Sequence, residues 1–398
     1  RFCRTRRKLS HMGTRTFVKQ RQPSLVERML TSNSGDAPLL MTVITLVVFG
    51  LLMLYSSSLD YSAEIMEQEP TYLFKRQLIW LGLGLVSAYL ISRFDYHHWR
   101  RLVVLVMLFT IVALVSVLTM NQIYLGAARS FYEGSIQPSE LAKLVTVIYL
   151  SAWLYAKRGQ LNDISLGLIP LGIILGIVGG LIGLQPDISA AATIIILGGM
   201  LFFLAGADLR QIIILMALAI VAAWLVMQIS ETGRIRIDDY IAGIKNPTQA
   251  SYHVRRSLEA IVNGNIFGLG IGRSITKLTG LPVPPTDSIF AVIAEEFGVI
   301  GAAMLIGLYS MMVWRGLVIA RRAPDMLGTL LATGLSFWIG LEALINMAVI
   351  VGLMPFAGNA LPFISAGGSS LVTSLAAMGI LYNISRQRGE GTQVEDEW

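Results

Sequence analysis

The feature that most constrains this chain is a series of ten apolar runs, most of them near the length that a helix needs to cross a bilayer. A spanning helix requires about 20 mostly apolar residues. In lipid, each backbone polar group must be satisfied within its own segment, so these runs predict helices. They cover 37–58, 77–92, 102–120, 136–156, 164–184, 188–206, 211–229, 289–314, 327–351 and 363–384.

Composition excludes the main alternative classes. The 398 residues are 54% hydrophobic and 14% charged, whereas a soluble domain has about 25% charged residues. The single Cys excludes a disulfide framework and a Cys-built zinc site, and four His leave little for a His-rich metal site. The net charge of +6 is typical of cytoplasmic loops and tails, rather than of nucleic-acid binding. We therefore predict an all-α polytopic membrane protein of about ten transmembrane helices.

The placement of Lys and Arg orients this bundle. With the N-terminus inside, most of the 31 basic residues fall in inside segments, and the short outside loops hold only Lys75, Arg76 and Arg129. An even number of spans then places both termini in the cytoplasm. The predicted parts are a basic cytoplasmic tail over 1–36, a transmembrane domain over 37–385 and a cytoplasmic tail over 386–398.

Residues 230–288 form the largest segment outside the predicted spans, and this orientation makes it one large extracytoplasmic loop. It contains a Gly-rich stretch from Gly264 to Gly272. No βαβ unit surrounds this stretch, so it is not a nucleotide-binding fingerprint. It is either an ordinary flexible loop or a place where backbone approaches a ligand closely at the membrane surface.

Asp287 stands at the start of the eighth predicted span, directly after a segment with three prolines. One interpretation is a helix N-cap, where a carboxylate accepts backbone N–H bonds. The other is a general base held at the outer membrane surface. Glu295 follows at an offset of eight residues, near the same helix face and about 12 Å further in. Glu296 is more easily interpreted as a structural partner for Lys143 or an Arg.

Further polar residues lie inside other predicted spans. Glu140 and Lys143 have the i,i+3 spacing of an ion pair on one helix face, and a self-satisfied pair is at least as plausible as a catalytic one. Asp187 follows a proline at an outer hairpin tip, where it is either a cap or a ligand-facing carboxylate. Glu342 and Asn346 are expected to bond neighbouring helices.

The order and spacing of these motifs resemble the SEDS family (shape, elongation, division and sporulation), to which FtsW and RodA belong. The resemblance covers about 37–385. The chain departs from the family pattern at several positions, for example at Pro285 and Ala366, without losing the carboxylate. The matching motifs are Phe74–Leu78, Gly126–Arg129, Gln137–Lys143, Gln185–Asp187, Thr286–Glu296, Leu361–Ser365 and Gly367–Ser370.

The resemblance implies a peptidoglycan glycosyltransferase that polymerises lipid II at the outer face of the bacterial cytoplasmic membrane. It also implies a class B penicillin-binding transpeptidase as partner, among other divisome or elongasome membrane proteins. In the family, the aspartate at the position of Asp287 is the catalytic residue. The long basic N-terminal tail and the stretch Leu52–Ser58 are more similar to the division (FtsW-like) branch than to the elongation (RodA-like) branch. A lipid II flippase or transporter and a non-catalytic scaffold remain as alternatives.

This chemistry suits the residues. A sugar hydroxyl would attack the anomeric carbon of the donor with a single inversion, so one base suffices, and Asp287 is the candidate. The lipid-pyrophosphate leaving group needs charge neutralisation by cations, either basic side chains or a divalent ion such as Mg²⁺ or Mn²⁺. The metal ligands are not identified. The substrate-binding candidates are Arg255, Arg256, Arg273, Lys277, Asp187, Glu140, Lys143, Glu295 and Ser365.

Overall fold

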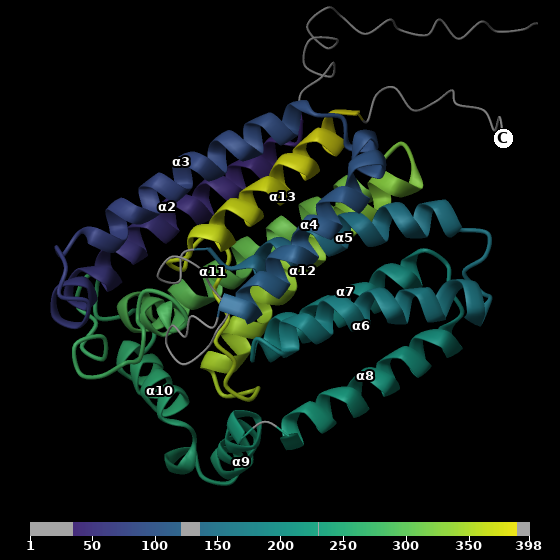
Figure 1. The fold of residues 1–398 in the computed structure, drawn as a ribbon. Coiled ribbons are helices and arrows are strands. Elements are labelled where there is room, and N and C mark those ends of the chain that lie inside the picture. Colours follow the sequence, from purple (N-terminus) through teal and green to yellow (C-terminus); the bar gives the residue numbers. More distant parts are fainter. Residues whose placement is uncertain (1–34, 121–135, 230, 388–398) are drawn as a thin grey trace, which may run out of the picture. The chain divides into compact units, whose positions relative to one another are not determined.

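A computed structural model describes residues 35–120, 136–229 and 231–387, which form twelve α-helices, α2 to α13, joined by turns and short 3-10 or π-helical segments (Figure 1). The predicted basic tail up to residue 34, the Gly126–Arg129 motif and residues 388–398 lie outside the described residues. The helices are α2 Ala37–Asp60, α3 Tyr72–Arg93, α4 Trp99–Met120, α5 Pro138–Lys157, α6 Ile169–Gly183, α7 Ile188–Leu204, α8 Leu209–Ile229, α9 Glu231–Lys245, α10 Tyr252–Gly264, α11 Ile289–Arg321, α12 Met326–Ile350 and α13 Gly368–Arg386.

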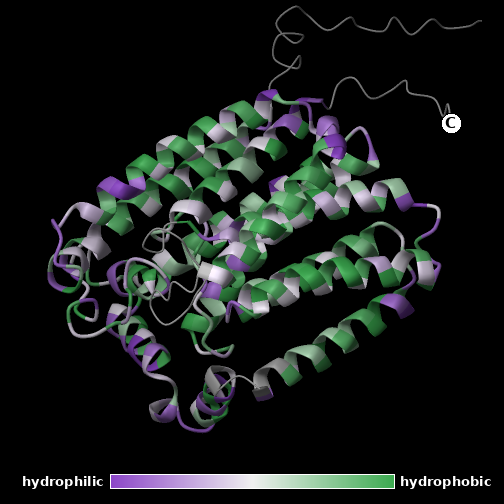
Figure 2. Ribbon diagram, viewed as in Figure 1, coloured by the Kyte–Doolittle hydropathy of each residue, from purple (hydrophilic) through white to green (hydrophobic). Residues whose placement is uncertain are grey.

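Each of the ten apolar runs coincides with one of these helices, which confirms the predicted all-helical class. Five helical segments are long and apolar enough to cross a membrane by length and composition, and α7 and α8 are shorter apolar helices. Helix α5 is less apolar because it buries polar side chains, among them Ser139, Lys143 and Ser151. Figure 2 shows hydrophobic residues along the long helices and hydrophilic residues gathered at their ends and on α9 and α10.

Small residues let the helices that carry the site approach closely. Helices α3 and α13 pack side by side (Figure 1). A Cβ added at Gly379 would lie 2.6 Å from the carbonyl oxygen of Ala88, and one added at Gly368 would lie 2.4 Å from the Trp80 ring. The small residues that open α13 therefore serve helix packing.

The two ends of the described chain meet at one end of the bundle. The backbone N–H of Asp36 donates to Ser385 Oγ (3.0 Å), and the Asp36 carboxylate pairs with Arg315 (2.6 Å). At the same end, Tyr96 donates its hydroxyl to Asp325 (2.8 Å) and its backbone N–H to Asn383 (3.2 Å). This arrangement agrees with an even number of crossings, and the cytoplasmic location of that end stays a prediction.

The segment 230–288 differs from the single loop that the sequence predicts, because it contains α9 and α10. Its Gly-rich stretch packs against a break in α11 at Gly298, where φ is 68°. A Cβ at Gly268 would lie 2.2 Å from the carbonyl oxygen of Glu296, and the N–H of Gly270 donates to that same oxygen (2.9 Å). The glycines thus permit a close backbone approach, but the partner is α11 and not a ligand.

Candidate active site

A cavity of about 370 Å³ opens among the first turns of α3, α5 and α7, helices α9 and α10, and the segments that precede α11 and α13. Elements far apart in the sequence meet here because each of them ends or turns at this level of the bundle. Its lining is largely polar and includes acids, bases and amides. The polar residues that line it are Arg76, Gln137, Glu140, Lys143, Asp187, Arg236, His253, Thr286, Asp287, Asn359, Ser369 and Ser370.

Asp287 lines this cavity from the turn before α11 and is half-buried. The N-cap position of α11 belongs to Ser288, one residue later, and its side chain makes no capping bond. The backbone around Asp287 is anchored at three successive carbonyls. Asn346 Nδ2 donates to the carbonyl of Asp287 (3.1 Å), Ser365 Oγ to that of Thr286 (2.6 Å), and the Ala366 N–H to that of Pro285 (2.8 Å). Helix α12 and the segment before α13 therefore fix the position of the backbone that carries this carboxylate.

Asp187 lines the same cavity at the tip of the α6–α7 hairpin. Its Oδ1 accepts from the N–H of Ala190 (3.2 Å), which caps α7. Its Oδ2 accepts from Gln137 Nε2 (2.9 Å) and from Ser139 Oγ (3.1 Å) at the start of α5. The two interpretations of Asp187 are thus compatible, since one residue both caps a helix and faces the cavity.

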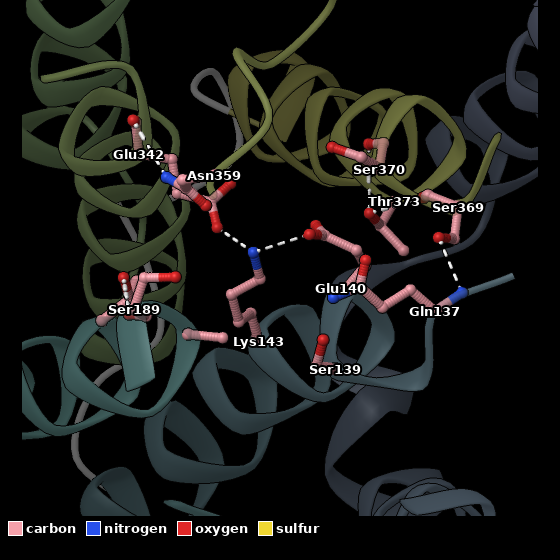
Figure 3. A network of polar contacts seen from close by, with 12 residues as sticks. Gln137, Ser139, Glu140, Lys143, Ser189, Glu342, Asn359, Ser369, Ser370 and Thr373 are labelled. Atoms are coloured by element: carbon pink, nitrogen blue, oxygen red, sulfur yellow. Dashed lines mark hydrogen bonds and ion pairs between the residues drawn. The ribbon is translucent and has the colours of Figure 1, made fainter. Parts of the chain in front are cut away.

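A buried ion network lies at the base of the cavity (Figure 3). Lys143 Nζ lies 3.0 Å from Glu140 Oε1, as the i,i+3 spacing predicts, and it also pairs with Glu342 of α12. Lys143 and Glu342 are each 1% exposed. Burial of such charges is costly unless each is paired. The network therefore ties α5 to α12 and leaves Lys143 fully engaged.

Besides Lys143, the positively charged side chains that line the cavity are Arg76 and Arg236, and His253 lines it as well. The sequence did not predict any of these three as a ligand. Arg76 lies in a motif of the family resemblance, and its guanidinium lies 5.6 Å from the centre of the Tyr72 ring. Within the described chain Arg76 makes no ion pair. Arg76 could have been predicted as a ligand from the sequence, because it lies in a motif of the family. Arg236 could not be singled out from the other basic residues of its segment.

The basic residues that the sequence favoured as ligands line other parts of the structure. Arg255 donates to the carbonyl of Thr248 (3.2 Å), and Arg256 pairs with Glu259 and bonds Thr279 Oγ1 (2.7 Å). Arg273 is exposed outside the cavity. None of these three arginines lines the cavity, so their role in substrate binding stays a prediction.

Lys277 also lies outside the cavity lining. Its Nζ lies 3.1 Å from Glu296 Oε1 and donates to the carbonyl of Ser56 (3.0 Å). Glu296 therefore has a structural partner, as expected, but the partner is Lys277 and not Lys143 or an Arg. Lys277 thus joins the segment between α10 and α11 to α2 and α11.

Glu295 and Ser365 hold backbone segments and do not line the cavity. The Glu295 carboxylate is fully buried and accepts from Asn263 Nδ2 (3.2 Å) and from both the backbone N–H (3.3 Å) and the hydroxyl of Thr276. Ser365 bonds the turn that carries Asp287, as described above. Both residues shape the site without facing it.

His253 lines the cavity as a neutral imidazole. Its ring stacks on Phe356, with centroids 4.1 Å apart. Burial, and then the positive charge of Arg236, lower the pKa of His253 to about 4. At neutral pH the positive charge of this wall therefore comes from arginine.

This depressed pKa predicts a pH-dependent stability. Between pH 6.5 and pH 4 the unfolded chain binds a proton at His253 that the folded chain does not, so the free energy of unfolding falls as pH falls through this window. We expect His253→Phe, which retains an aromatic ring against Phe356, to lose less thermal stability than the wild type between pH 7 and pH 5. Thermal unfolding scans of both proteins in the same detergent measure this difference. Parallel curves would contradict the assignment.

The described residues contain no group of three or more His, Cys, Asp or Glu side chains that could hold a metal ion. The carboxylates at the cavity are already bonded to protein donors in the case of Asp187, or paired with Lys143 in the case of Glu140. The ligands of a divalent ion are therefore not identified among the described side chains.

The fold and the cavity define a polytopic membrane protein with a polar, charged site at one end of its helical bundle. Residues 37–390 match the family of cell cycle proteins that comprises FtsW, RodA and SpoVE, so the chain belongs to this family. It is 33% identical to stage V sporulation protein E of Bacillus subtilis (90% of this chain, 99% of the relative). It is 36% identical to a probable peptidoglycan glycosyltransferase FtsW of Trichlorobacter lovleyi (88% of this chain, 93% of the relative).

Solved structures show the same fold. A chain of a peptidoglycan synthase complex, described as coordinating polymerisation and crosslinking, superposes with a TM-score of 0.72 at 26% identity (90% of this chain, 99% of that chain). The rod shape determining protein RodA of Thermus thermophilus gives a TM-score of 0.66 at 26% identity (90% and 98%).

Proposed function

We propose that this protein is a peptidoglycan glycosyltransferase that polymerises lipid II into glycan strands at the outer face of the bacterial cytoplasmic membrane. The observation that carries the proposal is the cavity in which Asp287, held by three backbone anchors, faces the same space as Arg76 and Arg236. The names of the FtsW relatives support the activity. Orientation with both termini in the cytoplasm puts this cavity on the outer side.

The reaction needs one base. The acceptor hydroxyl attacks the anomeric carbon of the donor, the new C–O bond forms as the bond to the lipid pyrophosphate breaks, and the configuration inverts. Asp287 takes the hydroxyl proton and later releases it to solvent. This differs from glycoside hydrolysis, which uses two carboxylates, because pyrophosphate leaves without protonation.

Charge on the departing pyrophosphate is neutralised by fixed cations. Arg76 and Arg236 suit this role because a guanidinium can bond phosphate oxygens bidentately. Lys143 is already bound to Glu140 and Glu342, so we assign it to the support of the cavity floor. A divalent ion such as Mg²⁺ or Mn²⁺ would arrive with the substrate phosphates, since Mg²⁺ usually binds through one or two carboxylates plus such phosphates.

The assignment of Arg76 and Arg236 as pyrophosphate ligands can be tested against Arg273, which the sequence favoured for that role. We expect Arg76→Ala or Arg236→Ala to lower kcat/KM for lipid II by about 10- to 100-fold, the loss of a charged hydrogen bond of roughly 1.5–3 kcal/mol. Arg273→Ala removes an equal charge outside the cavity and should change kcat/KM by less than about twofold. Initial rates with labelled lipid II measure all three, and a larger loss for Arg273→Ala would reverse the assignment.

We further propose the division branch and a crosslinking partner. Several of the FtsW relatives are about 34–36% identical over most of the chain, and the N-terminal residues favoured this branch. A structural neighbour belongs to a complex that combines polymerisation with crosslinking. A class B penicillin-binding transpeptidase is the corresponding partner for this chain.

The polymerase proposal is tested with the purified protein and its cognate transpeptidase. Labelled lipid II should yield long chains on a gel, and these chains should be cut by a muramidase, which cleaves β-linked glycan. The same preparation in vesicles should not move lipid II across the bilayer. Translocation without chain formation would replace the polymerase by a flippase.

A further inference from the structure

A second cavity, of about 600 Å³, lies between α4 and the last turns of α5. The candidate active site is at the opposite end of α5, which begins at Pro138 and ends at Lys157. A helix of 20 residues is about 30 Å long, so the two cavities are separated by most of the bundle. The second cavity belongs to the end where Asp36 and Ser385 meet, which is the predicted cytoplasmic end.

The charged side chains that line the second cavity are basic, and none of its lining residues is acidic. Its head is formed by His97, His98, Arg100 and Arg101. His97 lies between two carboxylates, with Nδ1 2.7 Å from Asp95 and Nε2 3.2 Å from Asp325. Neither arginine makes an ion pair within the described part of the chain. The guanidinium of Arg100 lies 4.8 Å from the centre of the Tyr155 ring in the last turn of α5. Two guanidinium groups thus face a space that holds no protein carboxylate.

The remaining walls are apolar and continue onto the surface of α4. Val103, Val104 and Trp153 line the cavity below the arginines. Beyond them, the exposed face of α4 carries Leu105 (66% exposed) and Leu108 (55% exposed). Residues three or four apart share a helix face, so this face forms an apolar strip that starts at the basic head. The combined surface fits a molecule with an anionic head and a hydrocarbon tail.

We propose that this cavity binds an anionic phospholipid of the cytoplasmic leaflet, with its phosphate at Arg100 and Arg101 and its acyl chains along α4. Basic pockets between transmembrane helices on the cytoplasmic side recognise such headgroups. A free anion would use the two arginines alone, whereas the acyl chains of a lipid would also cover the apolar strip. The proposal concerns a binding site distinct from the polymerase cavity and does not depend on the activity assigned there.

The test compares binding of phosphatidylglycerol, phosphatidylcholine and soluble glycerol 3-phosphate to the full chain by native mass spectrometry. We expect Arg100→Gln with Arg101→Gln to weaken phosphatidylglycerol binding about 30-fold, from about 1 kcal/mol per basic residue. Arg321→Gln with Arg322→Gln is the matched control, since these exposed arginines lie at the same end outside the cavity. It should bind within about twofold of wild type.

Three outcomes would overturn the proposal. Equal losses in the two double variants would show only general attraction between the membrane and basic residues. Unchanged binding in Arg100→Gln with Arg101→Gln would place the lipid elsewhere. Binding of glycerol 3-phosphate as tight as that of phosphatidylglycerol would make the site one for a soluble phosphate. If the double variant unfolds, Arg101→Gln alone should still lose about fivefold.

Discussion

Replacing Asp287 by Asn should reduce glycan polymerisation by at least about 10²-fold and up to about 10⁴-fold, the usual contribution of general-base catalysis. The amide has nearly the shape of the carboxylate but cannot accept the acceptor proton. The three bonds that anchor the turn end on backbone carbonyls, so they survive the substitution. Chain formation from labelled lipid II, with the transpeptidase present, measures the loss.

The matched control for this variant is Asp238→Asn, which removes an exposed carboxylate from α9 outside the cavity. It should polymerise at the wild-type rate. Thermal unfolding and partner binding must be unchanged in both variants for the comparison to hold. Equal chain formation by Asp287→Asn and wild type would remove Asp287 as the base, and Asp187 would be the next carboxylate in the cavity to test.

The second large effect is expected in the buried ion network. Lys143→Met should lower the free energy of unfolding by about 3–5 kcal/mol, because it leaves the carboxylates of Glu140 and Glu342 without their shared cation in a buried setting. Glu342→Gln keeps the 3.0 Å pair between Lys143 and Glu140, and its amide oxygen can still accept from Lys143. We expect that variant to lose less than about 1.5 kcal/mol.

The difference between these two expected losses tests whether Lys143 is the residue on which the buried network depends. Thermal and denaturant unfolding in the same detergent compare the three proteins. A Glu342→Gln loss as large as that of Lys143→Met would mean that the network depends on its second carboxylate as much as on its cation. A Lys143→Met variant as stable as the wild type would contradict the assignment of Lys143 as the support of the cavity floor.

The sequence by itself determined the helices and the class of the protein. In lipid, a run of about 20 apolar residues can satisfy its backbone hydrogen bonds only as a helix. Each predicted span accordingly coincides with a helix of the structure. Local spacing also predicted the pair of Glu140 and Lys143 correctly, because residues three apart on a helix are neighbours wherever that helix packs. Motifs in their order indicated the family.

Tertiary structure alone decided which charged residues share a cavity. Arg236 and Arg273 are equally basic members of one segment, and only the folding of α9 and α10 places the first at the cavity and the second outside it. Offset along a helix suggested that Glu295 would accompany Asp287, yet its carboxylate accepts hydrogen bonds from Asn263 of α10 and from Thr276. A side chain's partner depends on contacts made between distant parts of the chain, and helical periodicity contains no information about them.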